Sequence, residues 1–600
     1  MRYRHDTCSS ICSHVYLARM LDMFGQICII VVMHISIVPN RNSKPAILLR
    51  ESYREGEKVK KRTLANLSKL PMDQVQLIRR VLKGEQLVPV DTLFDVSASP
   101  HHGHVQAVRT AMKKLGFDNL IASRPTRERD LVMTMVAARI LQPESKLATT
   151  RWWCTTTLAD EWGLADATED DLYAAMDWLH ERQDRIEKKL AARHLKEGGL
   201  VLYDLTSSYF EGEACPLAKR GRDRDGKKGK LQVNYGLLTD SGGCPVSVSV
   251  HPGNTGDPTT LMPQLRKVKE TFNIDNLVLV GDRGMISQKQ VDQLKEIEGI
   301  DWITALRSSQ IRKLMEDETI QLSLFDKRNL FEFTHPEFPL ERLVVCRNPL
   351  MAERRARTRE SLIEATMEEL EKVKGMVERG KLKAKDKIGV RVGRVVNKYK
   401  VAKHFGLDIG EEHFAYQLLK EKVAAEAALD GLYVIRTSLA KERMHEADVV
   451  RSYKDLSNVE RAFRSFKLID LKVRPIYHHL EGRVRAHIFL CMLAYYVEWH
   501  MKEAWRELLF SDEDQAAKKI RDPVAPARRS AKSLKKVHGK TLDDGTAAHS
   551  FHTLLAELST IVRNTCRLKG AQPEESSFTM TTTPNAKQKR AFALLDTIAV

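Results

Sequence analysis

GLVLYDLTSSYF, at residues 199–210, is the stretch of sequence that decides the fold. It is short and rich in apolar and aromatic residues, which predicts a β-strand. Asp204 stands in the middle of it, with apolar neighbours on both sides. Burying a carboxylate in a core strand is costly unless the group is paired or binds a cation, so Asp204 is a candidate functional residue.

A second apolar run, NLVLVG at residues 276–281, is followed directly by Asp282. A continuous run of this kind is typical of a buried central strand. Ligands bind at the carboxyl ends of strands in open sheets, which makes Asp282 the second candidate. Two acids on strands that could be neighbours indicate a shared hard cation such as Mg²⁺, because this ion prefers oxygen ligands and keeps several waters.

The sequence around these two runs predicts an α/β domain. Further strands are expected at residues 231–239, 245–251 and 302–306, and helices at residues 259–272 and 288–297. The order is three strands, helix, strand, helix, strand. We therefore expect an α/β catalytic core with a ribonuclease-H-like mixed sheet flanked by helices.

The chain of 600 residues is too long for one hydrophobic core, so several domains are expected. They are residues 1–32, an upstream extension of the reading frame; 33–196, a mostly helical N-terminal region; 197–307, the first part of the core; 308–429, an insertion; 430–508, the second part of the core; and 509–600, a basic linker with a C-terminal helical tail. A signal peptide is the alternative for the first segment. The N-terminal region could bind DNA or serve only as a scaffold.

The charge of the chain favours a polyanionic partner. Lys and Arg total 97 against 79 Asp and Glu, a net charge of +18. We expect nucleic acid, because each neutralised phosphate releases a counterion; an anionic membrane surface is the alternative. The apolar run at residues 20–33 is too short and too polar to span a bilayer. The nine scattered cysteines lack a Cys-x-x-Cys pair, which favours a reducing cytosol over a zinc ribbon or a disulfide framework.

A third acid, Glu460, lies on a helix predicted over residues 447–467. Positions three or four apart place one set of side chains on a single face of this helix: Tyr453, Leu456, Glu460, Arg464 and Lys467. Such a face could present a carboxylate to metal ions and cations to DNA phosphates. Asp448 and Asp455 are competing acids nearby.

Each of the three acids also has an ordinary structural interpretation. Asp204 could cap a turn at residues 206–208, Asp282 could pair with Arg283, and Glu460 could pair with Arg464 on a solvated helix face. Taken singly, these interpretations are the simpler ones. Taken together, the three acids favour a catalytic site.

In their order along the chain, these motifs resemble the DDE transposases of bacterial insertion sequences. The resemblance is to the insertion-sequence-four superfamily and, within it, to the sixteen-thirty-four-like branch. That family carries Tyr, two residues, Arg, three residues, Glu, six residues, Lys, and Tyr453, Glu460 and Lys467 fall at those spacings. Leu456 stands at the Arg position, and Arg461 or Arg464 could substitute for the missing cation.

The resemblance implies cut-and-paste transposition by two-metal phosphodiester cleavage and strand transfer. Asp204 would bridge two Mg²⁺ ions, with Mn²⁺ as a substitute, and Asp282 and Glu460 would each hold one. The implied partners are double-stranded DNA, as terminal inverted repeats and target, and a second copy of the chain, all in the bacterial cytosol and without a membrane. The expected DNA contacts are Tyr453, Arg461, Arg464, Lys467 and Arg283. An inactive transposase that represses by binding DNA, and a nuclease that does not rejoin ends, remain alternatives.

Three weaker signals complete the sequence interpretation. Residues 219–230 contain seven Lys or Arg and either track phosphates or form a mobile charged loop. Trp302 could stack on a flipped base, although a Trp in a predicted strand is more often part of the core. The histidines at positions 101, 102, 104, 478 and 479 lack partners at zinc-ligand spacing and are expected at the surface or in turns.

Overall fold

The computed structural model describes residues 32–41, 43–85, 94–317, 320, 325, 329–525, 528–569 and 577–599. The chain folds as two compact units, Met1–Ala98 with Asn564–Met580, and Ser99–Arg563 with Thr581–Val600. Residues 1–31, and with them the expected extension or signal peptide, lie outside the described part. No helix in the described ranges is long and apolar enough to cross a membrane.

The first unit is built mainly from strands. Its N-terminal sheet is antiparallel, with β1 (Val32–Val38), β2 (Ala46–Glu55) and β3 (Lys58–Asn66) in that order, and α1 (Met72–Leu82) follows. A second sheet has the order β16 (Ser577–Thr581), β15 (Arg563–Leu568), β4 (Phe94–Ala98). The N-terminal region thus begins with a sheet, and its helical part lies further along the chain. The strand β3 is basic, with Lys58, Lys60, Lys61 and Arg62 on it, and all of its side chains are exposed.

Helices take over from residue 103, as expected. They include α2 (Gly103–Lys114), α4 (Arg127–Leu141), α7 (Glu169–His180), α8 (Gln183–His194) and α17 (Glu481–Ala504). Residues 169–194 form two helices with different partners, since α7 packs on α17 while α8 packs on β7 of the large sheet. Residues 486–498 of α17 are buried all around the helix, so α17 is part of the core.

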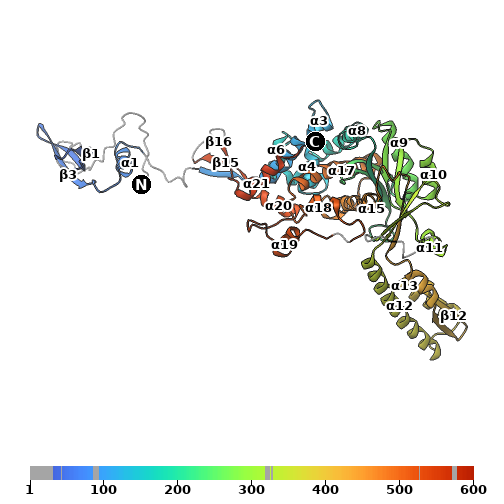
Figure 1. The fold of residues 1–600 in the computed structure, drawn as a ribbon. Coiled ribbons are helices and arrows are strands. Elements are labelled where there is room, and N and C mark those ends of the chain that lie inside the picture. The colour runs from blue at the N-terminus through green and yellow to red at the C-terminus, as the bar shows by residue number, and fades with distance from the viewer. Residues whose placement is uncertain are drawn as a thin grey trace. The chain divides into compact units, whose positions relative to one another are not determined.

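The second unit contains an eight-stranded mixed sheet with the order β10-β11-β14-β9-β8-β5-β6-β7 (Figure 1). The strands are β5 (Gly199–Tyr209), β6 (Gln232–Asp240), β7 (Pro245–Pro252), β8 (Leu277–Val280), β9 (Ile300–Ala305), β10 (Leu330–Phe333), β11 (Arg342–Arg347) and β14 (Leu432–Thr437). The β5–β8 and β8–β9 pairs are parallel and the others antiparallel. The expected mixed sheet flanked by helices is confirmed.

Helices cover both faces of this sheet. The helix α9 (Leu261–Glu270) packs on the face that carries Val201 and Tyr203 of β5. Successive side chains of a strand point to opposite faces, so Asp204 belongs to the other face. That face is covered by α16 (Leu456–Arg464), which packs on β5. Further helices are α10 (Gln288–Lys295), α11 (Ser308–Glu316) and α15 (Glu446–Lys454).

The insertion in the sheet is shorter than the sequence suggests. Residues 308–429 were expected to leave the core together, yet β10 and β11 belong to the large sheet. The inserted part comprises α12 (Pro349–Glu378), α13 (Lys385–Tyr399), β12 (Phe405–Ile409), β13 (Phe414–Leu418) and α14 (Lys420–Ala427). Figure 1 shows α12 and α13 side by side, and this part has an apolar core of its own.

The C-terminal segment is more ordered than a basic linker. It forms α18 (Gln515–Ile520), α19 (Ala531–Gly539), α20 (Phe551–Ser559) and α21 (Ala586–Leu595). Lys536 of α19 is buried and donates to the Leu509 carbonyl at 2.9 Å. The Trp505 indole donates to the carbonyl of Ala591 at 2.8 Å. Apolar side chains attach the segment as well, because Phe551, Leu554, Leu558 and Leu595 belong to the main hydrophobic core of the second unit.

Candidate active site

The register of two parallel strands brings Asp204 and Asp282 together. In the β5–β8 pair, Leu202 lies opposite Val280. Asp204 and Asp282 each follow two residues later, so both carboxylates are carried to the same edge of the sheet. This edge is the carboxyl end of β8, where the backbone leaves the sheet in a turn.

Glu460 reaches the same site from α16. Tyr235 of β6 shares the sheet face of Asp204, and its ring lies 6.0 Å from that of Phe463 in α16. Burial raises the pKa of Asp204 to about 7, and the negative charges of Asp282 and Glu460 add to this shift. The three carboxylates therefore act on one another, and we call them the acidic site.

Hydrogen bonds fix one oxygen of each aspartate. Asp204 Oδ1 accepts from the amide of Leu205 at 2.8 Å, and Asp282 Oδ1 accepts from the amides of Gly284 and Met285 at 3.0 and 2.7 Å. The alternative turn cap at residues 206–208 is wrong, because β5 continues through Tyr209. In the described part of the chain, no ion pair joins Asp282 to Arg283 or Glu460 to Arg464.

Tyr453 lies beside the acidic site. Burial raises its pKa to about 12, with contributions from the negative charges of Asp282, Glu460 and Asp204. The positive charge of Arg283 acts in the opposite direction, so this exposed arginine lies close by as well. Tyr453 belongs to α15 and not to the helix of Glu460, because the expected helix over residues 447–467 is interrupted at Asp455.

Lys467 does not share the exposed face expected for it. It follows α16 in a π-helical turn, Ser465–Ile469, and its side chain is buried. Its Nζ lies 2.9 Å from Asp225 Oδ1, and Arg474 pairs with the same carboxylate. Arg464 remains exposed at the end of α16. The π-helical turn changes the helical spacing, which moves Lys467 off the exposed face that carries Glu460 and Arg464.

Arg224 is a site residue that the sequence does not single out. Its Nη2 lies 2.5 and 2.6 Å from the two carboxylate oxygens of Asp257. Its positive charge lowers the pKa of Asp204, and its buried Nη1 has no hydrogen-bond partner among the described residues. Arg224 lies in the basic segment 219–230, and Asp225 of the same segment is bound by Lys467. Within this segment, residues 224 and 225 are thus anchored rather than mobile.

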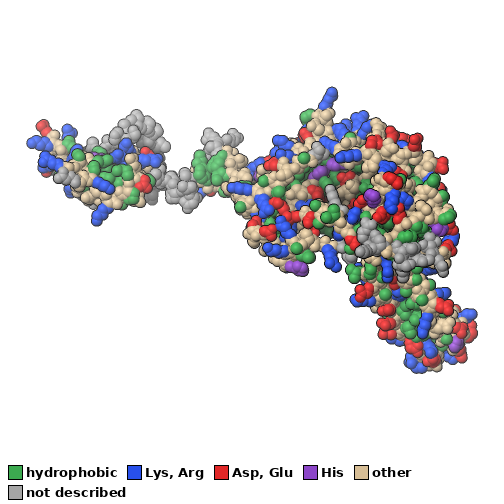
Figure 2. All heavy atoms as spheres, in the orientation of Figure 1, with side chains coloured by type: hydrophobic (Ala, Val, Ile, Leu, Met, Phe, Trp, Pro, Cys, Tyr) green, Lys and Arg blue, Asp and Glu red, His purple; other side chains and the backbone are tan. Residues whose placement is uncertain are grey.

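Arg461 faces a different hollow. It lines a cavity of about 840 Å³ together with basic side chains that include Arg451, Lys502, Arg506 and Arg529. Acidic side chains such as Asp455 and Asp512 line it too. On the face shown in Figure 2, Lys and Arg are likewise interspersed with Asp and Glu. The net positive charge is not gathered into one stripe on that face.

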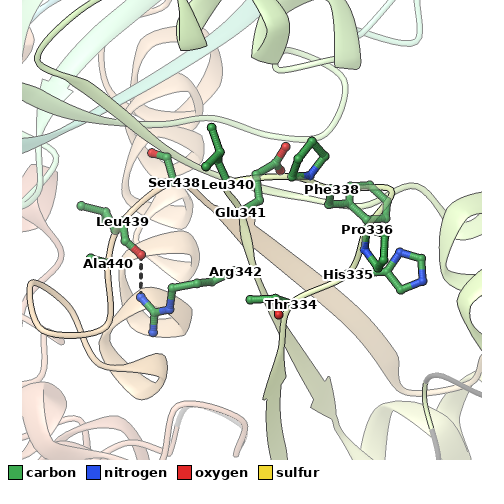
Figure 3. A pocket seen from close by; sticks show the side chains of 11 residues that line it. Thr334, His335, Pro336, Phe338, Leu340, Glu341, Arg342, Ser438, Leu439 and Ala440 are labelled. Atoms are coloured by element: carbon green, nitrogen blue, oxygen red, sulfur yellow. Dashed lines mark hydrogen bonds between the residues drawn. The ribbon is translucent and has the colours of Figure 1, made fainter.

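A second cavity, of about 470 Å³, lies next to β10 and β14 (Figure 3). The charged groups that line it are already paired. Arg342 donates to the Leu439 carbonyl at 2.8 Å, and Glu341 accepts two hydrogen bonds from the buried Arg436. Glu341 and Arg342 are therefore engaged in structural contacts and are not free for chemistry in this cavity. Trp302 is buried in β9, which makes it a core residue and not an exposed stacking partner.

Two of the five expected surface histidines are buried. His102 Nδ1 lies 2.8 Å from Thr157 Oγ1, and Arg563 donates to its other ring nitrogen at 3.1 Å. Burial lowers the pKa of His104 to about 4. His102 and His104 therefore belong to the packing between α2 and its neighbours, and that expectation was wrong for them.

Two solved transposase structures are similar to the chain. One is the piggyBac transposase synaptic complex with hairpin DNA, at 9% identity, 76% coverage of this chain, 77% of that chain and a TM-score of 0.35. The other is the Mos1 transposase paired-end complex with left transposon end, at 10% identity, 41% and 76% coverage and a TM-score of 0.14. At these scores the likeness carries no weight in the assignment. No curated protein matches the chain.

Two family models match the sequence. Residues 197–497 match the transposase DDE domain, and residues 35–88 match the N-terminal domain of IS1634 family transposases. The first match spans the sheet and the acidic site, together with the insertion, and the second spans the N-terminal sheet and α1. The sheet is accordingly a ribonuclease-H-like core, and the chain belongs to the DDE transposase family, in its IS1634-like branch.

Proposed function

We propose that this transposase moves an insertion sequence by cut-and-paste transposition, with Asp204, Asp282 and Glu460 as its catalytic residues. The observation that carries the proposal is the parallel register of β5 and β8, which brings Asp204 and Asp282 to one edge of the sheet, with Glu460 reaching them from α16. Three like charges at one sheet edge repel one another unless a cation lies between them. All their donor atoms are oxygens, which suits Mg²⁺, with Mn²⁺ as a substitute.

The acidic site fits the metal ions that DDE transposases generally use. Asp204, Asp282 and Glu460 would together hold the ions through their carboxylate oxygens. When bound, such ions lower the pKa of an attacking water or 3′-hydroxyl and stabilise the leaving oxygen of the phosphodiester. The amide hydrogen bonds on Oδ1 of Asp204 and Asp282 fix the orientation of both carboxylates.

The neighbouring side chains would hold the DNA backbone. Arg283 and Arg464 are exposed beside the acidic site and can contact phosphates on either side of the scissile bond. The phenol of Tyr453 stays protonated at neutral pH and can donate a hydrogen bond to a phosphate oxygen. Arg461, on another hollow, would contact DNA further from the cleavage position.

Lys467 would act through another residue. Its ion pair with Asp225, shared with Arg474, anchors the segment that carries Arg224. We therefore assign Lys467 a positioning role, unless DNA displaces Asp225. This positioning role differs from the direct phosphate contact expected from the sequence, for which the ammonium group of Lys467 would have to be unpaired.

The proposed partners are the terminal inverted repeats, the target DNA and a second copy of the chain. Two ends are joined in one event, which requires two acidic sites near one another. The N-terminal sheet exposes Lys58, Lys60 and Lys61 on β3, so this unit is a candidate for binding the terminal repeats.

A strand-transfer assay tests the proposal against its alternatives. The purified chain is incubated with a labelled terminal-repeat end and a supercoiled target plasmid, with Mg²⁺ or with EDTA. We expect joined product with Mg²⁺ only. Cut ends without joined product would favour a nuclease that does not rejoin DNA. Binding without cutting under any divalent metal would favour a repressor.

A further inference from the structure

A second polar cluster lies in the catalytic unit, formed by His194, Cys244 and His500. The three residues come from separate elements: His194 ends α8, Cys244 precedes β7, and His500 lies near the end of α17. One ligand atom from each residue lies within 4.8 Å of the other two. Among the described residues this is the only such group of His, Cys, Asp or Glu. We call it the His–Cys cluster.

The geometry of the cluster fits a tetrahedral metal ion. Cys244 Sγ lies 3.8 Å from His500 Nε2. Zinc bonds of about 2.3 Å to sulfur and about 2.1 Å to nitrogen place two such ligands roughly 3.6 Å apart at a tetrahedral angle. Cys244 and His500 are thus close to coordination distance, and the ligand atom of His194 lies within 4.8 Å of both, so side-chain rotations could bring all three onto one ion.

The surroundings of the cluster are those of a built site. The Tyr496 hydroxyl lies 3.0 Å from His194 Nε2, and the rings of Tyr496 and Trp499 lie 4.8 and 4.9 Å from that of His500. Polar and aromatic neighbours of this kind orient ligating histidines.

The cluster also opens to solvent on one side. His194 and His500 line a cavity of about 470 Å³, whose walls include Arg193, Trp499 and Glu503. The cavity gives an ion a way in and leaves room for a water as fourth ligand. The positive charge of Arg193 opposes a cation there. The carboxylates of Asp240 and Glu503 lie near Cys244, and their negative charges counter the repulsion between Arg193 and a bound cation.

We propose that His194, Cys244 and His500 bind one Zn²⁺ ion, with a water from the adjoining cavity in the fourth position. Two nitrogens and one sulfur are ligands that Zn²⁺ accepts and that Mg²⁺ does not favour. Cys244 binds as the thiolate, and its proton passes to solvent. The ion would add a direct link between α8, the turn between β6 and β7, and α17, beside the hydrogen bonds of His194 to Tyr496 and of Cys244 to His500.

Cobalt substitution tests the site in the full-length chain. Chelator-treated protein is titrated with Co²⁺, which reports tetrahedral geometry by visible d–d bands and sulfur ligation by a near-ultraviolet charge-transfer band. We expect both signals at one equivalent, and their loss when Zn²⁺ is added. The carboxylates of the acidic site have no sulfur and cannot give the charge-transfer band, so the two proposals fail independently.

Matched variants locate the signals. Cys244→Ser should abolish the charge-transfer band, and His500→Gln should weaken Co²⁺ binding by roughly 10-fold or more. Cys491→Ser is the control, because Cys491 is equally buried and lies on the same helix as His500. Its titration should match that of the unchanged chain. An unchanged charge-transfer band in Cys244→Ser would overturn the proposal.

Because a substitution at a buried position can disturb folding, a second measurement uses the unchanged chain. X-ray absorption at the zinc edge of the zinc-loaded protein should show one sulfur at about 2.3 Å and nitrogen or oxygen neighbours at about 2.0–2.1 Å. A zinc environment without sulfur, or no zinc retained after dialysis, would contradict the site.

Discussion

The acidic site and the His–Cys cluster belong to the same sheet domain but differ in every property that selects a metal ion. The acidic site offers only carboxylate oxygens, and two of its three side chains are exposed. The His–Cys cluster offers two imidazoles and a thiol, with Cys244 and His500 buried. Hard ions that keep their waters suit the first, and Zn²⁺ suits the second. The difference predicts that each site can be removed without the other.

The largest expected effect is the loss of DNA cleavage when a carboxylate of the acidic site is replaced. Asp204→Asn or Asp282→Asn should lower DNA cleavage by roughly 10³-fold or more, because each removes a ligand of the ions that stabilise the transition state. Binding to the terminal repeats should stay nearly unchanged. Cleavage is measured in gels and binding by mobility shift, with Cys491→Ser as the control. Retained cleavage in either variant would remove that residue from the catalytic set.

A large effect on stability is expected beside the acidic site. Asp225→Asn leaves the buried Lys467 and Arg474 without their shared counter-ion, which should lower the free energy of unfolding by about 3 kcal/mol. Denaturant unfolding followed by tryptophan fluorescence measures this. Glu213→Gln, at an exposed position of the preceding segment, is the control. Equal midpoints for both variants would show that the ion pair is not needed for folding.

A smaller effect depends on pH. The pKa of Asp204 in the metal-free folded chain, about 7, lies above the unfolded value near 3.9. Its protonated form therefore contributes stability that is complete below the unfolded pKa and is lost as the pH rises through about 7. Asp204→Asn cannot ionise, so its melting temperature should exceed that of the unchanged chain increasingly from pH 4 to pH 8. A difference that does not vary with pH would argue against the raised pKa.

The smallest effect concerns one phosphate contact. Arg464→Ala should weaken DNA binding similarly for all sequences and reduce the slope of log K against log salt concentration by about one. The measurement is a salt titration by fluorescence anisotropy. Arg312, which is exposed on α11, provides the control as Arg312→Ala. An unchanged slope for Arg464→Ala would place this side chain off the DNA path.

The sequence predicts the sheet well where strands are continuous apolar runs. The apolar composition of β5 and β8 predicts both strands. The positions of Asp204 within β5 and Asp282 just after β8 single out these two residues as candidate site residues. Only the parallel register of the two strands shows that the acids are neighbours. The pairing of β11 with β14 could not be predicted, because it joins strands across an insertion of about 80 residues whose length gives no register.

Other features depend on tertiary contacts that composition does not report. Helical spacing places Lys467 with Glu460, but a break at Asp455 and a π-helical turn separate them. Arg224 and Asp257 form their pair across 33 residues. The His–Cys cluster joins positions 194, 244 and 500, a spacing that resembles no metal-binding motif.

Anomalous X-ray diffraction from crystals of the chain with cleaved terminal-repeat DNA and Mn²⁺ tests the central claim most directly. We expect Mn²⁺ density in contact with Asp204, shared on one side with Asp282 and on the other with Glu460, next to the terminal 3′-hydroxyl. Mn²⁺ bound elsewhere, with these three carboxylates free of metal beside properly seated DNA, would contradict the assignment of the acidic site as the catalytic centre.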